Sequence, residues 1–154
     1  MSQDTVQPTQ EEKVMAALAH VTTLLPFMGL VAPIVIWVTQ KDKSDYVNFQ
    51  ALQALAYQIS MILFWFFGMG CYMCSFFGTF FLIPGGAMLA EGREEVVEPI
   101  MLLTFLIPFA IIMVMFGIFI AFIIYGIIGS IMTLQGRDFQ YVFIGKRVKR
   151  FMEK

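Results

Sequence analysis

Charge is missing from most of this 154-residue sequence. All 21 charged residues lie in four short clusters, and residues 14–40, 46–90 and 99–136 carry none. A helix needs only about 20 apolar residues to cross a bilayer core, whereas about a quarter of the residues of an ordinary soluble domain are charged. The absence excludes such a domain and predicts an all-α integral membrane protein.

Residues that carry chemistry are also scarce, with two cysteines and one histidine in the chain. Cys71 and Cys74 form a C-x-x-C, but no second pair completes a zinc site and no histidine follows it as haem attachment requires. The uncharged stretches hold no carboxylate of the kind that a proton pump uses. We therefore expect no enzyme, no metal and no cofactor, and nucleic acid is not an expected partner.

The N-terminal part lacks the features of a targeting sequence. Residues 1–10 form a polar tail without the basic region of a secretory signal or the basic, acid-poor composition of a transit peptide, so we expect the mature chain to start near Met1. Thr9 and Glu12 have the spacing of a capping box, which predicts a helix start at this point.

The first apolar segment, residues 11–39, is broken by Pro26, Gly29 and Pro33. A proline inside a helix removes a hydrogen bond and clashes with the preceding turn, so one straight helix is not expected. Two arrangements fit: a single kinked span, or a re-entrant pair of half-helices over residues 11–25 and 30–39. Each half is about 15–22 Å long, too short to cross alone.

Two long transmembrane helices are expected after this segment. The first covers residues 45–83 and is ended by Pro84, and the second covers residues 99–134. Residues 84–98 would connect them as an acidic loop, and residues 137–154 would form a basic amphipathic tail. The loop at 41–45 and the tail hold eight Lys or Arg residues against one in residues 91–98, which predicts a cytoplasmic tail and an exterior acidic loop.

Uncharged polar residues gather in two places. Gln50, Gln53, Tyr57 and Ser60 follow helical spacing and form one stripe, and His20 lies with Thr22 and Thr23 in the first segment. Because polar groups in lipid need partners, we expect the two sets to face each other. They would form either a hydrogen-bonded latch between helices or the lining of a polar path.

Small residues recur on one face of each long helix. In the first helix they are Gly70, Cys74 and Gly78; in the second, Gly117, Ala121 and Gly129 share a face, with Gly126 beside it. Stripes of this kind let membrane helices approach closely. Packing between the chain's own helices and association of two copies both fit.

The C-terminal tail is amphipathic, with Ile144, Val148, Phe151 and Met152 on one side. The other side carries cations suited to anionic lipid headgroups, namely Lys146, Arg147, Lys149 and Arg150.

Three stretches resemble a known family. Residues 46–54 (YVNFQALQA), residues 13–20 (KVMAALAH) followed by Leu25 and Pro26, and residues 136–145 (GRDFQYVFIG) are similar to motifs of the chloroplast inner-envelope import component of the twenty-kilodalton translocon family and its bacterial relatives. Asn48 stands where that family usually has Arg. The resemblance implies a bacterial inner (cytoplasmic) membrane protein with both ends on one side, which favours the re-entrant hairpin.

Two functions follow from these observations. The first is a small multi-pass scaffold or accessory subunit that associates with the bilayer and with copies of itself or another membrane subunit. The alternative is a channel or protein-translocation component whose polar path is lined by Gln50, Gln53, Tyr57 and His20.

Overall fold

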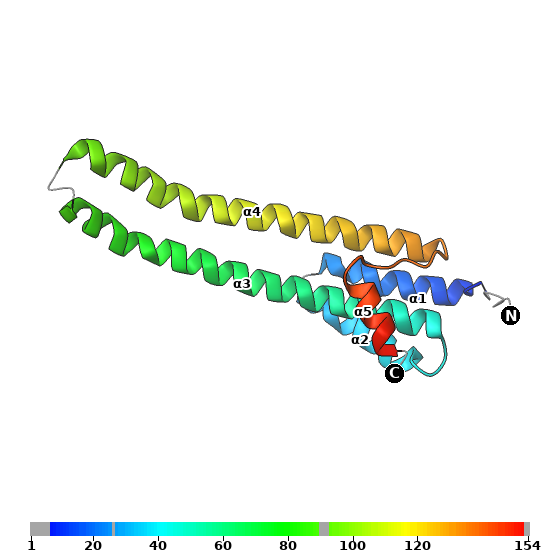
Figure 1. Cartoon of the computed structure of the whole chain (residues 1–154). Helices are drawn as coiled ribbons and strands as arrows, with labels where there is room; N and C mark the ends of the chain where they lie inside the picture. Colours follow the sequence, from blue (N-terminus) through cyan, green and yellow to red (C-terminus); the bar gives the residue numbers. More distant parts are fainter. Residues whose placement is uncertain (1–6, 26, 90–92, 153–154) are drawn as a thin grey trace. The chain divides into compact units, whose positions relative to one another are not determined.

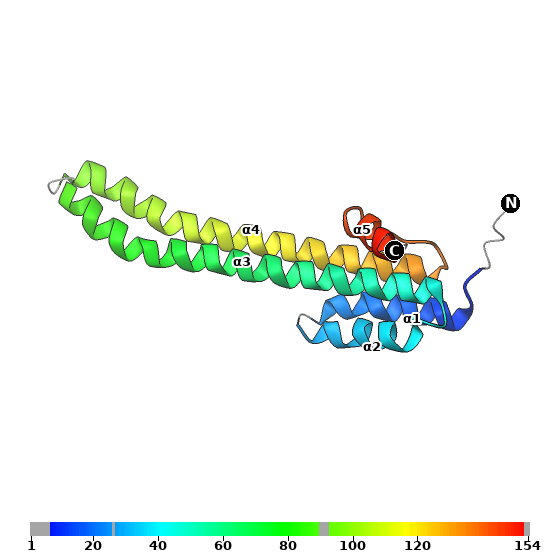
Figure 2. The ribbon, with the colours of Figure 1, turned by 60° about the horizontal axis from the view of Figure 1, so that its bottom comes forward.

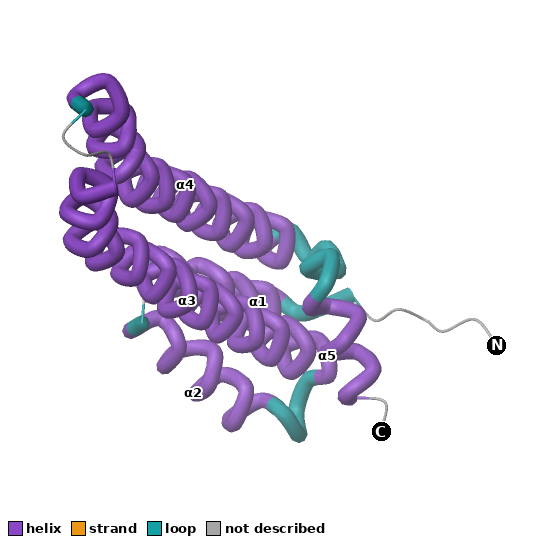
Figure 3. The backbone as a smooth tube through the Cα atoms, turned by 60° about the vertical axis from the view of Figure 1, so that its left-hand side comes forward, coloured by secondary structure: helices purple, strands orange, loops and turns teal. Residues whose placement is uncertain are grey.

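The computed structural model describes residues 7–25, 27–89 and 93–152, and every element within these ranges is a helix or a connecting loop (Figure 3). This confirms the all-α prediction. The elements in order are α1 (Gln10–Val21), the 3-10 turns η1 (Thr22–Leu24) and η2 (Met28–Leu30), α2 (Val31–Gln40), α3 (Asp45–Leu89), α4 (Glu94–Leu134) and α5 (Ile144–Met152).

Helix α1 begins with the capping box that the sequence predicts. The Glu12 N–H donates to Thr9 Oγ1 at 3.3 Å, and the Thr9 N–H donates to Glu12 Oε2 at 2.6 Å. The same carboxylate accepts a hydrogen bond from Ser44 Oγ at 2.5 Å. The cap therefore joins the start of α1 to the residue that precedes α3.

Helices α1 and α2 run antiparallel and pack side by side (Figures 1 and 2). At the turn, the Gly29 N–H donates to Leu25 O, and a Cβ on Gly29 would lie 2.1 Å from Thr22 O. Only glycine permits this approach. Pro33 is the third residue of α2, where a missing N–H breaks no intrahelical bond. The first segment is therefore a helical pair; Pro26 lies outside the described residues.

Helices α3 and α4 are long and apolar enough to cross a membrane, over Asp45–Gly86 and Val97–Leu134. With 45 and 41 residues, they extend about 68 and 62 Å at 1.5 Å per residue, roughly twice a 30 Å bilayer core. A tilt of 40°, the upper end of the usual range, still leaves each helix longer than the core.

The predicted end of the first long helix and the predicted start of the second were wrong, whereas the first begins at Asp45 and the second ends at Leu134 as expected. Helix α3 continues through Pro84 to Leu89, and α4 begins at Glu94, before Pro99. Residues 84–89 and 94–98 of the expected loop are thus helical, and residues 90–92 lie outside the described part. A proline removes one ladder hydrogen bond, and such a local loss is tolerated in membrane helices, whereas ending the helix in lipid would leave several backbone groups without partners.

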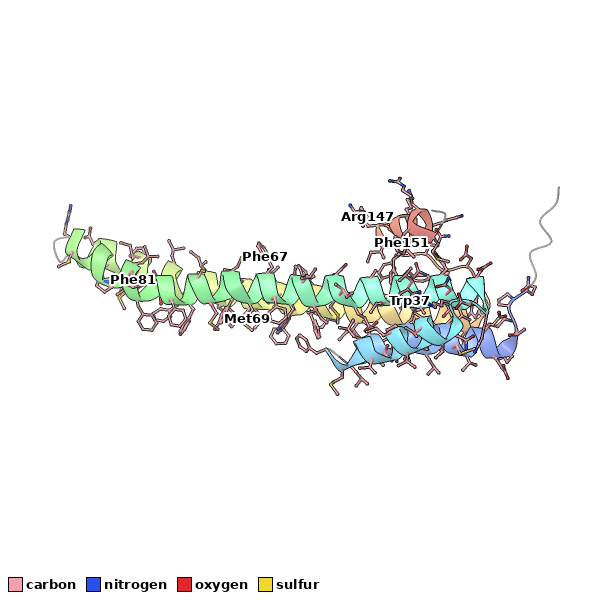
Figure 4. All side chains as sticks on the ribbon, turned by 90° about the horizontal axis from the view of Figure 1, so that it is seen from below. Trp37, Phe67, Met69, Phe81, Arg147 and Phe151 are labelled. Carbon is pink, nitrogen blue, oxygen red and sulfur yellow. The ribbon has the colours of Figure 1, made fainter. Side chains whose placement is uncertain are left out.

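The chain divides into two compact units, Met1–Ile62 with Ala121–Lys154, and Leu63–Ile120. In the first unit, Ala19, Ala51 and Ala54 form a core against which Ile36 and Trp37 pack. These small side chains allow close helix contact. In the second unit, Trp65 makes edge and tilted contacts with Phe116 and Phe119. Phe67 and Phe81 point away from α3 (Figure 4) and are exposed.

Candidate functional site: a buried polar latch

His20 is the centre of a buried hydrogen-bond network in the first unit. Its side chain is fully buried on the face of α1 that meets α3. Nε2 lies 3.1 Å from Gln50 Oε1 of α3, and Nδ1 lies 3.1 Å from the hydroxyl of Tyr141, in the loop before α5. One imidazole therefore joins three segments that are far apart in the sequence.

Main-chain groups set the orientation of both glutamine side chains. Gln50 Nε2 and Gln53 Nε2 donate to Phe139 O at 3.1 and 2.7 Å, and Gln53 Oε1 accepts from the Tyr141 N–H at 3.3 Å. A carbonyl only accepts and an N–H only donates. The amides are thus fixed, with Gln50 Oε1 left to accept from His20 Nε2 and from Gln53 Nε2.

The same geometry determines the state of the imidazole. Because Gln50 Oε1 accepts, His20 Nε2 carries a proton. The ring is fully buried and its hydrogen-bond partners Gln50 and Tyr141 carry no charge, so a charged imidazolium is disfavoured and Nδ1 accepts from the Tyr141 O–H. His20 is then neutral and both its nitrogens are used. Every polar side-chain atom of His20, Gln50 and Gln53 has a partner inside the protein.

An aromatic cluster closes the network on one side. The rings of Tyr57 and Tyr141 are stacked with centroids 4.0 Å apart and planes at 6°, and Tyr125 and Phe139 meet Tyr141 edge-on. The Tyr57 hydroxyl donates to Phe122 O at 2.9 Å. Burial raises the pKa of Tyr141, chiefly because the phenolate would be desolvated, so its hydroxyl keeps the proton that it donates to His20.

The structure brings together most, but not all, of the polar residues expected here. Gln50, Gln53 and Tyr57 share one buried face of α3 opposite His20, as their spacing indicates. Ser60 is exposed and donates to Ala56 O within its own helix. Thr23 is buried with its hydroxyl lacking a hydrogen-bond partner among the described residues.

Sequence reasoning missed three members of this region. Gln58 donates to Ala19 O and to Thr22 Oγ1 of the first segment, but it lies off the stripe of Gln50 and Gln53. Phe139 and Tyr141 lie in a loop, where no periodicity marks a buried position. The available signal was the uncharged aromatic run at residues 139–143 between charged neighbours.

The small residues divide into two groups. A Cβ on Gly126 would lie 2.8 Å from Thr23 Cβ, and one on Gly129 would lie 2.8 Å from Phe139 Cε1. A Cβ on Gly70, Gly78 or Gly117 would meet nothing within 4 Å. Cys74 and Ala121 are exposed. The expected packing stripe of α3 therefore has no neighbour in the described chain. The α3 glycines that are in contact are Gly68, which meets Met115, and Gly86, which meets Ile100.

Helix α5 presents all its cations to the outside. Lys146, Arg147, Lys149 and Arg150 are exposed, whereas Gly145 and Val148 are buried. Arg147 and Phe151 project from this helix in Figure 4. The hydrogen-bonded cluster of His20, Gln50, Gln53 and Tyr141 is called the latch below. A Cβ on Gly145 would lie 3.3 Å from Gln53 Oε1, so α5 lies directly beside the latch.

The chemistry available here is that of holding segments together. No group of three or more His, Cys, Asp or Glu residues that could hold a metal ion occurs among the described residues. The latch fixes the C-terminal loop to α1 and α3, and Ser130 Oγ adds a hydrogen bond to Ala17 O at 3.0 Å.

The comparisons with known proteins correct the family assignment. No curated protein and no solved structure matches the chain significantly. A family model described as the magnetosome magnetite crystal formation protein family (MamF/MmsF) matches residues 11–148. The resemblance to the chloroplast import family was therefore wrong: it depended on three motifs of eight to ten residues each, whereas the family model matches most of the chain. The match covers all five helices but for the first residue of α1 and the end of α5, and the chain belongs to the magnetosome magnetite crystal formation family.

Proposed function

We propose that the chain is a non-catalytic scaffold or accessory subunit of the magnetosome membrane, the bacterial inner-membrane invagination in which magnetite crystals form. Family membership supports the compartment and the process. The observation that carries the mechanical part is the latch, because its imidazole and both amides are fully used in joining α1, α3 and the C-terminal loop. Because these side chains have all their hydrogen bonds within the protein, they are suited to holding the three segments in one fixed arrangement.

In the membrane, α3 and α4 each cross once and the α1–α2 pair enters and leaves on the cytoplasmic face. The excess of Lys and Arg in residues 41–45 and 137–154 supports a cytoplasmic C-terminus. The connection between α3 and α4 then faces the interior of the compartment. A reporter fused after Lys154 that is active only when exported should stay inactive; activity would reverse this orientation.

Self-association is the second part of the proposal. The open faces at Gly70, Gly78 and Gly117 allow a second copy to approach closely. The surplus apolar length of α3 and α4 over one bilayer core also favours cover by protein. At the cytoplasmic end, Lys146, Arg147, Lys149 and Arg150 are free to contact anionic headgroups at about 1 kcal/mol each.

The alternative function is a channel or translocation path along Gln50, Gln53, Tyr57 and His20. A path needs polar atoms that face water, and in this cluster they bond to one another and to Phe139 O. This favours the latch. Single cysteines at Gln53 and Tyr57 should resist water-soluble thiol reagents in intact membranes; rapid labelling would favour the path.

The direct test of the proposal is made in cells. In a strain that lacks this chain, the parent should restore normal magnetite crystals and Gln53→Leu should restore them poorly, because the variant loses the bonds to Phe139 O and Tyr141. Gln140→Leu is the matched control, since Gln140 is exposed. Crystal size is measured by electron microscopy and protein level by immunoblot. Unchanged crystals in the deletion strain would contradict the proposed function.

A further inference from the structure

The α1–α2 hairpin is too short to cross a bilayer and deep enough to reach its middle. From Val14, where the charges of α1 end, to Leu24, at the end of η1, the chain has eight helical residues and a 3-10 turn. These extend about 18 Å, against about 15 Å for half of a bilayer core. At the opposite end of the hairpin, α1 begins and α2 ends beside charged residues.

The charges of the hairpin all lie at its open end. Glu11, Glu12 and Lys13 stand in the first turns of α1, and residues 41–45 follow α2. The closed end carries no charge, and beyond Thr22 and Thr23 its exposed side chains Leu24, Leu25, Phe27 and Met28 are apolar, with Met28 75 % exposed. A charged base and an uncharged tip match the headgroup layer and the acyl chains of a single leaflet.

The outward face of the hairpin is also apolar. Val31, Ile34, Val35 and Val38 follow one face of α2 at spacing i, i+3, i+4, i+7, and all four are exposed. The opposite face of α2 packs with Ile36 and Trp37 on the alanine core. The exposed face is continuous with the tip and has the same chemistry, so acyl chains fit both.

Because the hairpin ends near the middle of the core, it would add protein to the leaflet on the side of its charged base only. Helices α1 and α2 belong to the unit that contains Asp45–Ile62 of α3 and the last residues of α4. With a helix diameter of about 10 Å, the hairpin adds roughly 150–200 Å² to one leaflet.

We propose that the hairpin is a one-leaflet wedge that makes this protein prefer membranes convex on the side of the hairpin's charged base. Its occupant is the acyl-chain layer of that leaflet. Extra area in one leaflet is accommodated when the membrane curves so that this leaflet lies on the convex side. The inference rests on the proposed membrane placement of α1–α2, and with the base on the cytoplasmic side it matches the outward-curved face of a closed vesicle.

Depth is measured first. Met28→Trp is made in the full-length chain with Trp37→Phe and Trp65→Phe, and quenching is compared between lipids brominated near the headgroup and near the acyl terminus. The wedge requires strongest quenching by the deep bromines. Strongest quenching by the shallow bromines would place the tip at the surface and overturn the proposal, whatever the effect of the chain on crystals.

Curvature preference is measured next. The full chain is reconstituted into one mixture of small sonicated and large extruded vesicles that have the same lipid composition. The vesicles are then separated by size, and the amount of protein per lipid is determined for each size. We expect severalfold enrichment on small vesicles with the C-terminus outside. Val31→Ser/Val35→Ser, which makes the outward face polar, should lose the enrichment, whereas Val31→Leu/Val35→Leu should keep it. Equal protein per lipid on both sizes for the parent, or enrichment unchanged in the serine variant with native helix content, would overturn the wedge.

Discussion

Tyr141 shows how much the latch depends on one hydroxyl. Tyr141→Phe leaves the stacking on Tyr57 but removes the donor to His20 Nδ1. An average side-chain hydrogen bond in a membrane protein contributes about 0.6 kcal/mol, and a buried group left without a partner costs about 1–3 kcal/mol. We expect a loss of about 1 kcal/mol in the free energy of unfolding, measured in mild detergent. Tyr72→Phe, on α3 outside the latch, is the matched control; equal losses for both would contradict the latch.

Two glycines that look equivalent in the sequence should respond differently. Gly129→Leu places a side chain against Phe139 and His20, whereas Gly78→Leu extends into open space. We expect Gly129→Leu to lower the melting temperature of the single chain markedly. Gly78→Leu should leave that temperature near the parent's and instead reduce the fraction of dimer or larger species in light scattering. The reverse pattern would mean that Gly78, and not Gly129, packs within the single chain, which would contradict the prediction.

The cap at the start of α1 makes the base of the hairpin sensitive to acid. Hydrogen bonds from Ser44 and from the Thr9 N–H lower the pKa of Glu12 below its usual range. A lowered pKa in the folded state gives stability that is present above the unfolded pKa and is lost as the pH falls through the folded value. Glu12→Gln should therefore be less stable than the parent at pH 7, and the difference should shrink below about pH 4. A difference that is constant with pH would exclude the carboxylate as its source.

The turn of the hairpin depends on Gly29. Any side chain there collides with Thr22 O, so Gly29→Val should force the two helices apart. Spin labels at Leu18 of α1 and Val35 of α2, both exposed, report this as a longer and broader distance distribution. Gly70→Val, at a position with open space around it, should leave the distribution unchanged. A narrow, parent-like distribution in Gly29→Val would mean that the turn is held by other contacts.

Sequence patterns were sufficient to predict those features that depend on residues close together in the chain. The capping box at Thr9 and the break at Gly29 could be predicted because each depends on neighbours within seven residues along the chain. Pro84 and Pro99 misled because one lost hydrogen bond in a long apolar helix costs less than ending it. The burial of Tyr141 and Gln58 could not be predicted, because it depends on contacts with helices that are more than 35 residues away in the sequence.

The glycine stripe failed for a related reason. Helical spacing groups Gly70, Cys74 and Gly78 on one face, but it does not say what that face meets. Within the described chain the close contacts of α3 are made elsewhere, among them those of Gln53, of the alanines Ala51 and Ala54, and of Gly68.

At the scale of the whole molecule, the placement of α1–α2 decides which side of the membrane each loop faces. The pair is antiparallel and joined by a tight turn, so its two ends should lie on one side, with the C-terminal tail. With Cys71 and Cys74 replaced by serine, single cysteines at Gln10 and Asp42, both exposed, should react with an impermeant thiol reagent only from the cytoplasmic face. A span would put the two positions on opposite faces. Labelling of Gln10→Cys from outside intact cells, with Asp42→Cys still protected there, would therefore replace the hairpin by a crossing helix and would remove the leaflet asymmetry with it.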